Sequence, residues 1–311
     1  MTVATPTTRF ARWQADRLLT DLRRKLARTA QSASPAAVHD LRVAIRRFLQ
    51  VLAVFRLTFP AHQSKKIHRK LKQVMDPAGE LRNCDIAAIL IPKLDPKSAP
   101  HLRGKIQGAR KSAERKLTQS LRRLVDRRLP AKWRAGLDLD STQNGSGRRE
   151  IPQAEQHILK EMATQFLKLG KKAASPETSA RQVHRFRIAS KKFRYTLELF
   201  EPFHAAELTP WLERVKAVQS VLGDANDCET VRRMVSRWNA GEGLIAKLEK
   251  RQRRKLKKFR QEWDAMPGAN AFPTVAPPKP APRVNAPRRG VAPSSSRSAS
   301  SKSAPPRSAV A

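Results

Sequence analysis

Apolar residues recur every three or four positions along most of the chain, the spacing of helices with one buried face. Leu18, Leu22 and Leu26 mark the first such helix, between about residues 10 and 30. No alternation of apolar and polar residues and no β-branched run indicates a strand. Further helices are expected at about residues 35–57, 64–75, 82–90, 100–128, 154–169, 177–200, 210–221, 227–238 and 243–263. The pattern therefore predicts an all-α fold.

Two segments interrupt this helical pattern. Residues 138–153 contain STQNGSG, a polar stretch with glycines that is typical of a linker. Residues 267–311 are rich in Pro, Ser, Ala and Arg and contain no acid, so they cannot bury a core. We therefore expect one folded region, residues 1–266, made of helical halves at 10–137 and 154–266. A disordered basic tail follows it.

The two helical halves repeat each other. VHDLRVAIRRFLQVLAVF at residues 38–55 aligns without gaps with VHRFRIASKKFRYTLELF at residues 183–200. Further along, GELRNCD at residues 79–85 aligns with GDANDCE at residues 223–229, and each reads as a turn before the next helix. A repeat of this length predicts two similar helical bundles, related by a pseudo-two-fold axis when they pack symmetrically.

The repeated helix is cationic on one side and apolar on the other. His39, Arg42 and Arg46 fall within about 60° of one another on a helical projection, with Arg47 at the edge of this stripe. No acid in the first two turns of the stripe neutralises it through i,i+4 pairs. The opposite arc holds Leu41, Ala44, Ile45, Phe48, Val51, Leu52 and Phe55. The second stripe holds His184, Arg187, Lys191, Lys192, Arg194 and Tyr195. This recurrence favours anion binding over a merely solvated face.

The net charge of the chain is strongly positive, because 64 Lys and Arg against 26 Asp and Glu give +38. Self-repulsion of this size destabilises a compact fold, which indicates a polyanionic partner. Nucleic acid, an anionic membrane surface and polyphosphate all satisfy that condition. Aromatic residues make up only 5% of the chain, which disfavours a single-strand binder that stacks bases on aromatic rings.

Other classes of protein lack their signatures in this sequence. Cys84 and Cys228 belong to no CxxC pair, so they are expected to be buried packing residues rather than zinc ligands or a redox pair. Asp224, Asp227 and Glu229 are interpreted as a turn and a helix start rather than a metal site. The N-terminal segment lacks a secretory signal, and no run approaches the ~20 apolar residues of a membrane span. We expect a soluble cytoplasmic protein with no membrane partner, no metal and no cofactor.

The doubled motif resembles the CHAD family, named for its conserved histidine α-helical domain. Both copies read H-x-x-R-x-A-x-[RK]-[RK], and each is followed by the turn G-x-x-[RN]-[DN]. The resemblance covers about residues 10–265. It implies two four-helix bundles in pseudo-two-fold arrangement, a basic groove between them that binds inorganic polyphosphate, and association with polyphosphate granules. Some members carry a fused triphosphate-tunnel enzyme, whose acidic strand motifs are missing here, so a stand-alone binding module is implied.

The resemblance also assigns individual residues to the groove. The implied polyphosphate-binding residues are His39, Arg42, Arg46, Arg47, Lys72, His184, Arg187, Lys191, Lys192, Arg194, Tyr195 and Lys216. Possible extensions of the groove are Arg110, Lys116, Arg251 and Lys255. The chain departs from the family at Asn83, where Asp is usual. The second half keeps the usual Asp, at Asp227. If that Asp orients a basic residue, the first half is held less rigidly. Gln50 is a second departure, opposite Tyr195 of the second copy.

Two other functions remain open on the sequence. A nucleic-acid-binding protein fits the net charge, and the basic tail suits non-specific binding of DNA or RNA, although helix-turn-helix, RRM, KH and zinc-finger signatures are missing. An enzyme that makes or cuts phosphoanhydrides usually needs carboxylate-held Mg²⁺ or an activated nucleophile. The basic stripes carry no paired acids and the chain has no P-loop, so we expect no enzyme and no catalytic residue.

Overall fold

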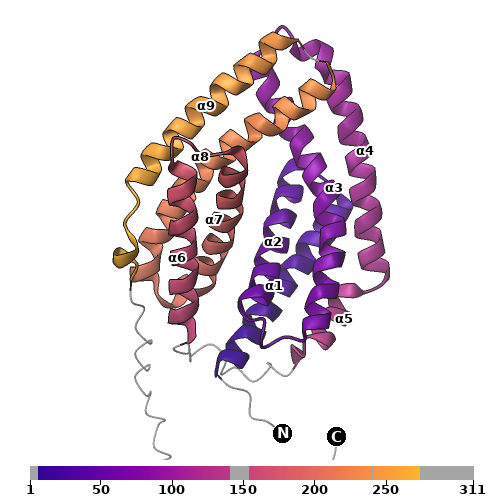
Figure 1. The fold of residues 1–311 in the computed structure, drawn as a ribbon. Helices are drawn as coiled ribbons and strands as arrows, with labels where there is room; N and C mark the ends of the chain where they lie inside the picture. Colours follow the sequence, from indigo (N-terminus) through magenta and orange to yellow (C-terminus); the bar gives the residue numbers. More distant parts are fainter. Residues whose placement is uncertain (1–5, 141–153, 240, 274–311) are drawn as a thin grey trace, which may run out of the picture. The chain divides into compact units, whose positions relative to one another are not determined.

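The computed structural model describes residues 6–140, 154–239 and 241–273 of the chain. All regular elements in these ranges are helices, as the apolar pattern predicts (Figure 1). The first half contains α1 (Pro6–Gln31), α2 (Pro35–Val54), α3 (Ala61–Leu94), α4 (Ala99–Asp126) and α5 (Leu129–Gly136). The second half contains α6 (Ala154–Ala174), α7 (Ala180–Phe200), α8 (Ala205–Arg237) and α9 (Glu242–Asp264). Short 3-10 helices lie at Glu201–Phe203 and Ala269–Ala271.

The two repeated helices, α2 and α7, begin at well-formed N-caps. The Ser34 hydroxyl accepts a hydrogen bond from the Ala37 amide, and Pro35 occupies the first turn of α2. At the start of α7, Ser179 and Gln182 form a reciprocal capping box. Such caps satisfy amides that have no partner inside the helix and contribute about 1 kcal/mol each. They fix where each cationic stripe begins.

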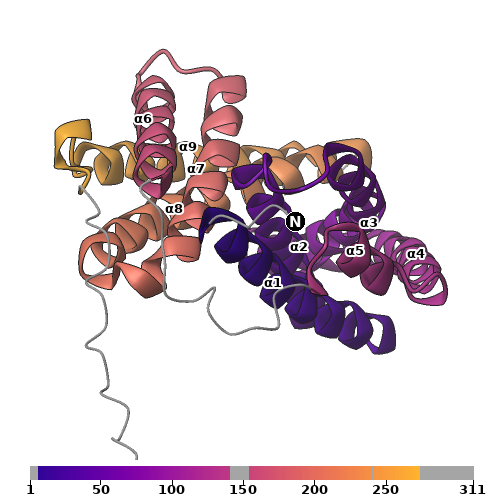
Figure 2. The ribbon, with the colours of Figure 1, turned by 90° about the horizontal axis from the view of Figure 1, so that it is seen from below.

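The two halves have the same arrangement and meet through equivalent helices. Helices α1 and α2 pack together, as do α3 and α4, and the pairs α6–α7 and α8–α9 repeat this order. The halves then contact each other through α2 with α7 and α3 with α8. Seen from below, α1–α5 gather on one side and α6–α8 on the other (Figure 2). The fold is therefore two similar four-helix bundles in pseudo-two-fold arrangement, with α5 added to the first.

Apolar contacts near the axis join the halves into one folded unit. The rings of Phe55 and Phe200, equivalent residues of the repeat, lie 6.1 Å apart, and Phe10 stacks on Phe200 at 5.9 Å. A second cluster is built around the two cysteines, Cys84 and Cys228, which are buried as predicted. It combines the C-terminal parts of α3 and α8 with the N-terminal parts of α4 and α9. Neither half therefore completes its core alone.

Two predicted turns are wrong, because α3 runs unbroken through Gly79 and α8 through Gly223. Glycine in a helix costs about 1 kcal/mol relative to alanine, and the interior Pro77 costs about 3 kcal/mol. The buried residues nevertheless keep helical spacing across each site, as Val74, Ala78 and Leu81 do in α3. The apolar contacts of the continuous helix outweigh these local penalties. The carboxylates after Gly223 therefore lie inside α8 rather than at a helix start.

The folded part extends past the boundary expected at residue 266. Phe272 lies against Phe193 and Trp211, with ring centroids 5.9 and 4.9 Å apart respectively. Its burial there adds apolar contacts that composition alone did not indicate. Most of the expected linker (141–153) and the remainder of the expected tail (274–311) lie outside the described residues. None of the described helices combines the length and the apolar character needed to cross a bilayer.

Candidate anion-binding site

Four cations meet where α2 and α7 face each other. Arg42 and Arg46 come from α2, Arg187 and Lys191 from α7, and all four are half-buried. We call them the central cationic cluster. Their apolar counterparts, on the far side of each helix, lie in the core as predicted. Within the described residues no carboxylate forms an ion pair with any of the four, which separates them from most other cations considered below.

Burial lowers the pKa of three residues of the central cationic cluster, Arg42, Arg187 and Lys191. Burial, with the charges of Arg46 and Arg187, lowers the pKa of Arg42 to about 10, which leaves the guanidinium charged at neutral pH. The pKa of Arg187 is also lowered by burial, although Asp227 opposes the shift. Burial and then Arg187, Arg46 and Arg42 lower the pKa of Lys191 to about 7. An anion placed here would relieve both penalties at once.

Arg42 lies against α3, where a glycine leaves space for its guanidinium. Its Nη1 donates a hydrogen bond to the Met75 carbonyl oxygen at 3.2 Å. A Cβ built on Gly79 would lie 2.9 Å from the same Nη1, closer than real side chains pack. The equivalent Gly223 of α8 has no atom within 4 Å of such a Cβ. The glycine of the first motif therefore leaves space for the Arg42 guanidinium, and that of the second does not serve this purpose.

Arg187 has a different neighbour, the carboxylate of Asp227 on α8, whose charge acts on it without an ion pair. Burial raises the pKa of Asp227, while the charges of Arg187 and Arg82 oppose that rise. The first half has Asn83 at the equivalent position, and there Met75 and Gly79 position the arginine instead. Where Asn83 replaces the usual Asp, the arginine of the first half thus has other neighbours than a carboxylate. The two equivalent arginines therefore have unlike surroundings, a hydrogen bond to α3 for Arg42 and a nearby carboxylate on α8 for Arg187.

Arg82 is a neighbour of the central cationic cluster that the sequence reasoning missed. Its charge lowers the pKa of Arg42, after burial and other arginines, and acts on Asp227 as well. Burial and then Arg82 also lower the pKa of His39. The repeat did not reveal it because Asn226 occupies the equivalent position in the second half. The sequence feature that could have indicated Arg82 is its place in the repeated GELRNCD motif, one helical turn after Gly79.

Polar contacts join α2 to α7 beside the central cationic cluster. Gln50 Nε2 donates to Thr196 Oγ1 at 3.0 Å, and Arg47 Nε donates to Glu198 Oε2 at 2.8 Å. Arg194 also faces Glu198, at 3.5 Å. Gln50 and Thr196 are positions where the two copies differ, and this contact gives that difference a structural role. Arg47 and Arg194, both predicted to bind polyphosphate, are thus already paired with a carboxylate.

Tyr195, another predicted site residue, is enclosed rather than presented to a ligand. Its ring is only 4% exposed, and the Arg194 guanidinium lies over it at 4.8 Å from the centroid. It nevertheless lies near the central cationic cluster, since it is among the groups that affect the pKa of Arg42. Tyr195 therefore forms part of the wall behind the cluster.

The remaining predicted residues lie at the edge of this site. His39 is close enough to Arg42 and Arg46 for their charges to act on it. His184 and Lys192 are exposed on α7. Lys72 pairs with Asp76 at 2.6 Å and Lys216 with Glu213 at 2.7 Å, each along its own helix. No contact of these two lysines with the central cationic cluster is observed among the described residues.

The four suggested extensions of the groove have protein partners. Arg110 pairs with the buried Asp85 and with Glu114, both at 2.9 Å. Lys116 pairs with Glu80, and Lys255 with Asp224. Arg251 donates to the Cys228 thiol. These cations stabilise the packing of α4 and α9 and carry less uncompensated charge than the central cationic cluster.

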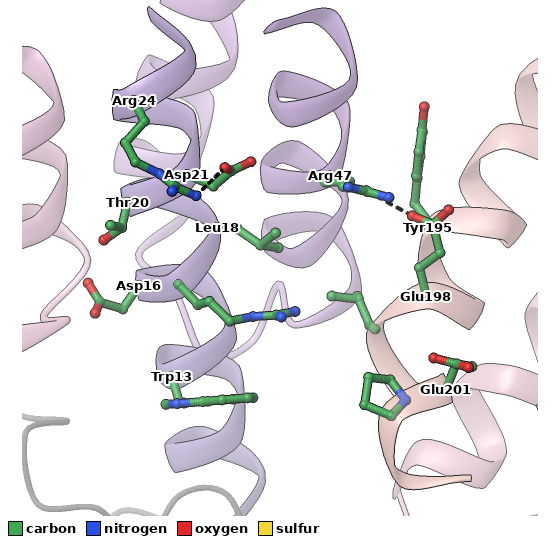
Figure 3. A pocket seen from close by; sticks show the side chains of 13 residues that line it. Trp13, Asp16, Leu18, Thr20, Asp21, Arg24, Arg47, Tyr195, Glu198 and Glu201 are labelled. Carbon is green, nitrogen blue, oxygen red and sulfur yellow. Dashed lines mark hydrogen bonds and ion pairs between the residues drawn. The ribbon is translucent and has the colours of Figure 1, made fainter. Parts of the chain in front are cut away.

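Two cavities are lined by neighbours of the central cationic cluster, although none of its four residues lines either one. The larger, about 740 Å³, lies between α1 and α7 and is lined by Trp13, Arg47, Tyr195 and Glu198 among others. Figure 3 shows Arg47 reaching across it from α2 to Glu198. The smaller, about 180 Å³, is lined by Arg82, Asp227 and Arg251 among others. Tyr195 lines the larger cavity and Arg82 the smaller, and both affect the pKa of Arg42.

The acidic residues of α8 do not converge on one point. Asp224 pairs with Lys255 and Glu229 with Arg232 and Arg233, while Asp227 faces Arg187. In the part of the chain that the structure describes, no three His, Cys, Asp or Glu side chains gather as metal ligands do. Their carboxylates are directed to neighbouring cations instead.

Comparison with known proteins identifies the family. The family model described as CHAD domain matches residues 14–236. The chain belongs to the CHAD domain family. The crystal structure of the CHAD domain from the plant Ricinus communis has a TM-score of 0.66 with 21% identity, covering 84% of this chain and 92% of that one. PptA from Streptomyces chartreusis has a TM-score of 0.59 with 14% identity, covering 84% and 98%. No curated protein sequence matches the chain.

Proposed function

We propose that this CHAD protein binds inorganic polyphosphate at the central cationic cluster. The observation that carries the proposal is the set of four half-buried cations, Arg42, Arg46, Arg187 and Lys191, with no ion-paired carboxylate among the described residues. Like charges brought together out of water raise the free energy of the fold unless a ligand neutralises them. The resemblance of the sequence motifs to polyphosphate-binding CHAD domains supports the same ligand.

The side chains of the central cationic cluster suit a flexible phosphate chain. Guanidinium groups bind phosphate oxygens in pairs, and an ammonium acts as a point charge that tolerates sliding. Arginines from α2 and α7 contact such a chain from both sides. Bases gain little from Tyr195, an aromatic residue beside the cluster, because it is almost fully enclosed. These features favour polyphosphate over single-stranded nucleic acid.

We further propose that binding occurs without hydrolysis. Metal-assisted phosphoanhydride cleavage needs carboxylates that hold Mg²⁺ beside the ligand. Asp227 is the acid next to the central cationic cluster, and it faces Arg187 and Arg82. A protein of this kind associates with polyphosphate granules by holding their chains. Release of phosphate from polyphosphate by the purified chain with Mg²⁺ or Mn²⁺ would contradict the non-enzymatic part of the proposal.

Competition between polyanions tests the choice of ligand. Fluorescent long-chain polyphosphate is bound to the full chain at moderate salt, and excess duplex DNA is then added. We expect polyphosphate to stay bound, because DNA that occupies the basic tail leaves the central cationic cluster filled. Displacement of polyphosphate by DNA at equal phosphate concentration would indicate diffuse charge attraction and would favour the nucleic-acid alternative.

A further inference from the structure

Lys191 is unlike the other lysines near the central cationic cluster. It is half-buried among arginines, and none of the described residues forms a hydrogen bond or an ion pair with its ammonium group. Its Nζ is not among the side-chain nitrogens sealed from solvent. Its neighbour Lys192 is exposed on the same helix. The two lysines therefore offer one type of amine in two environments.

The surroundings of Lys191 favour the reactive form of its amine. Burial, reinforced by Arg187, Arg46 and Arg42, lowers its pKa from 10.5 to about 7. At pH 7 the amine is then neutral in about half of the molecules, with a free lone pair on Nζ. The same arginines form a ready site for a phosphoryl group. A nucleophile and an anion-binding site thus lie side by side.

We propose that Lys191 is an acylation site whose substrates are acyl phosphates, with the phosphoryl group held by Arg42, Arg46 and Arg187. The neutral Nζ attacks the acyl carbon, and a C–N amide bond forms. The C–O bond to phosphate breaks, and inorganic phosphate leaves with the electron pair. The amine proton passes to the departing phosphate or to water. No oxidant, metal or further reactant is needed.

Acylation removes one of the four charges and places an uncharged group between the arginines. The effect on polyphosphate affinity rests on the function proposed above, whereas the reactivity of Lys191 does not. Polyphosphate and acyl phosphates compete for the same arginines. Bound polyphosphate therefore protects Lys191, and acylation weakens later binding of polyphosphate. The modification couples the acyl phosphate level to occupancy of the site.

Site-resolved mass spectrometry of the full chain incubated with acetyl phosphate at pH 7.5 tests the proposal. Lys192 is the matched control, because it is the next residue in the chain and lies exposed. We expect Lys191 to be acetylated about tenfold faster, since far more of its amine is neutral. Polyphosphate should slow Lys191 much more than Lys192, which lies exposed at the edge of the site. Equal or slower reaction at Lys191 would overturn the proposal.

A second variant separates phosphoryl binding from amine reactivity. Arg46→Gln removes one phosphoryl-binding group and also one charge that lowers the pKa of Lys191. The loss of amine reactivity affects acetyl phosphate and the uncharged reagent p-nitrophenyl acetate equally. We expect Arg46→Gln to slow the reaction with acetyl phosphate more than that with the ester. Equal slowing would overturn the role of the arginines in holding the phosphoryl group.

Failure of this proposal and failure of the proposed function give different results. A slow Lys191 on a chain that binds polyphosphate tightly overturns acylation and leaves the function standing. A fast Lys191 on a chain that does not bind polyphosphate, with no protection by it, supports acylation and contradicts the function.

Discussion

Single residues of the central cationic cluster carry a local cost in stability. Arg42, Arg46, Arg187 and Lys191 repel one another in a partly buried setting, and their lowered pKa values report that cost for three of them. Functional sites commonly carry such local destabilisation. Most of the other cations predicted for the site have carboxylate partners and carry no comparable penalty. Burial and the lack of an ion-paired carboxylate among the described residues separate the four cations of the cluster from these others.

The pH dependence of binding is expected to follow Lys191. Its pKa is about 7 in the free protein, and a bound polyanion raises it, so binding above pH 7 requires proton uptake. Affinity for long-chain polyphosphate should therefore fall between pH 6 and pH 9, as measured by fluorescence anisotropy. Lys191→Arg keeps its charge and should flatten this response. Burial lowers the pKa of His39 below its usual value, which reduces its contribution to this response. An unchanged pH profile in Lys191→Arg would refute the assignment.

Lys191→Met is expected to stabilise the free protein at pH 6. The folded pKa of Lys191 lies below the unfolded value, so the unfolded chain binds more protons between about pH 7 and 10.5. Wild-type stability therefore rises with pH across this window, and below it the folded state bears the full cost of the charge. Removing the charge should add about 1 kcal/mol at pH 6, discounted for solvent exposure. Thermal unfolding at several pH values measures this gain, which should shrink towards pH 10. A variant less stable at pH 6 would oppose this account.

Gly79→Ala is expected to weaken binding by displacing Arg42. Its Cβ would lie 2.9 Å from the Arg42 guanidinium, which must move. Gly223→Ala is the matched control, because its Cβ meets no atom within 4 Å at the equivalent position. Each alanine favours its helix by roughly 1 kcal/mol, so both chains stay folded. Titration with polyphosphate should show lower affinity for Gly79→Ala alone. Equal affinities in both variants would exclude the proposed positioning role.

Elements were predictable where local chemistry decides them. The apolar arc of α2, the Ser34 cap and the repeat in α7 all follow from spacing and side-chain type. The continuity of α3 through Gly79 was not predictable, since long-range packing outweighs the local penalties there. The pairing of Arg47 with Glu198 also depends on how α2 meets α7, which the periodicity of each helix does not encode. Sequence therefore located the cationic stripes but did not distinguish free cations from paired ones.

Gly170→Ala is expected to disrupt the packing of α6 on α9. A Cβ on Gly170 would overlap the indole ring of Trp263, which also contacts Phe166 and Phe186. Forcing the ring away from these neighbours should cost about 2 kcal/mol. Gly104→Ala on α4 is the control, because its Cβ meets nothing within 4 Å. Chemical denaturation should show a loss for Gly170→Ala and none for Gly104→Ala. Comparable stability of the two would contradict this packing argument.

The whole molecule combines a diffuse positive charge with one focused site. A net charge of +38 attracts any polyanion, and this property was evident from composition. The focus arises because equivalent helices of the repeat, α2 and α7, meet near a pseudo-two-fold axis and bring their cations together. The pseudo-two-fold arrangement was predicted from the repeat, whereas the shared cores that hold the halves together required the structure. The central claim is that this focused site, rather than total charge, binds polyphosphate.

Removal of equal charge from two places tests that claim most directly. One variant replaces Arg42, Arg46, Arg187 and Lys191 with alanine, and the other replaces the exposed Arg24, Lys132, Arg233 and Lys250. Affinity of each full chain for long-chain polyphosphate is measured over a range of salt concentrations, with thermal unfolding as the check of folding. We predict that the first variant stays folded and loses about 100-fold in affinity, whereas the second stays within a few-fold of wild type. Equal losses in the two folded variants would contradict a focused site and leave only diffuse attraction.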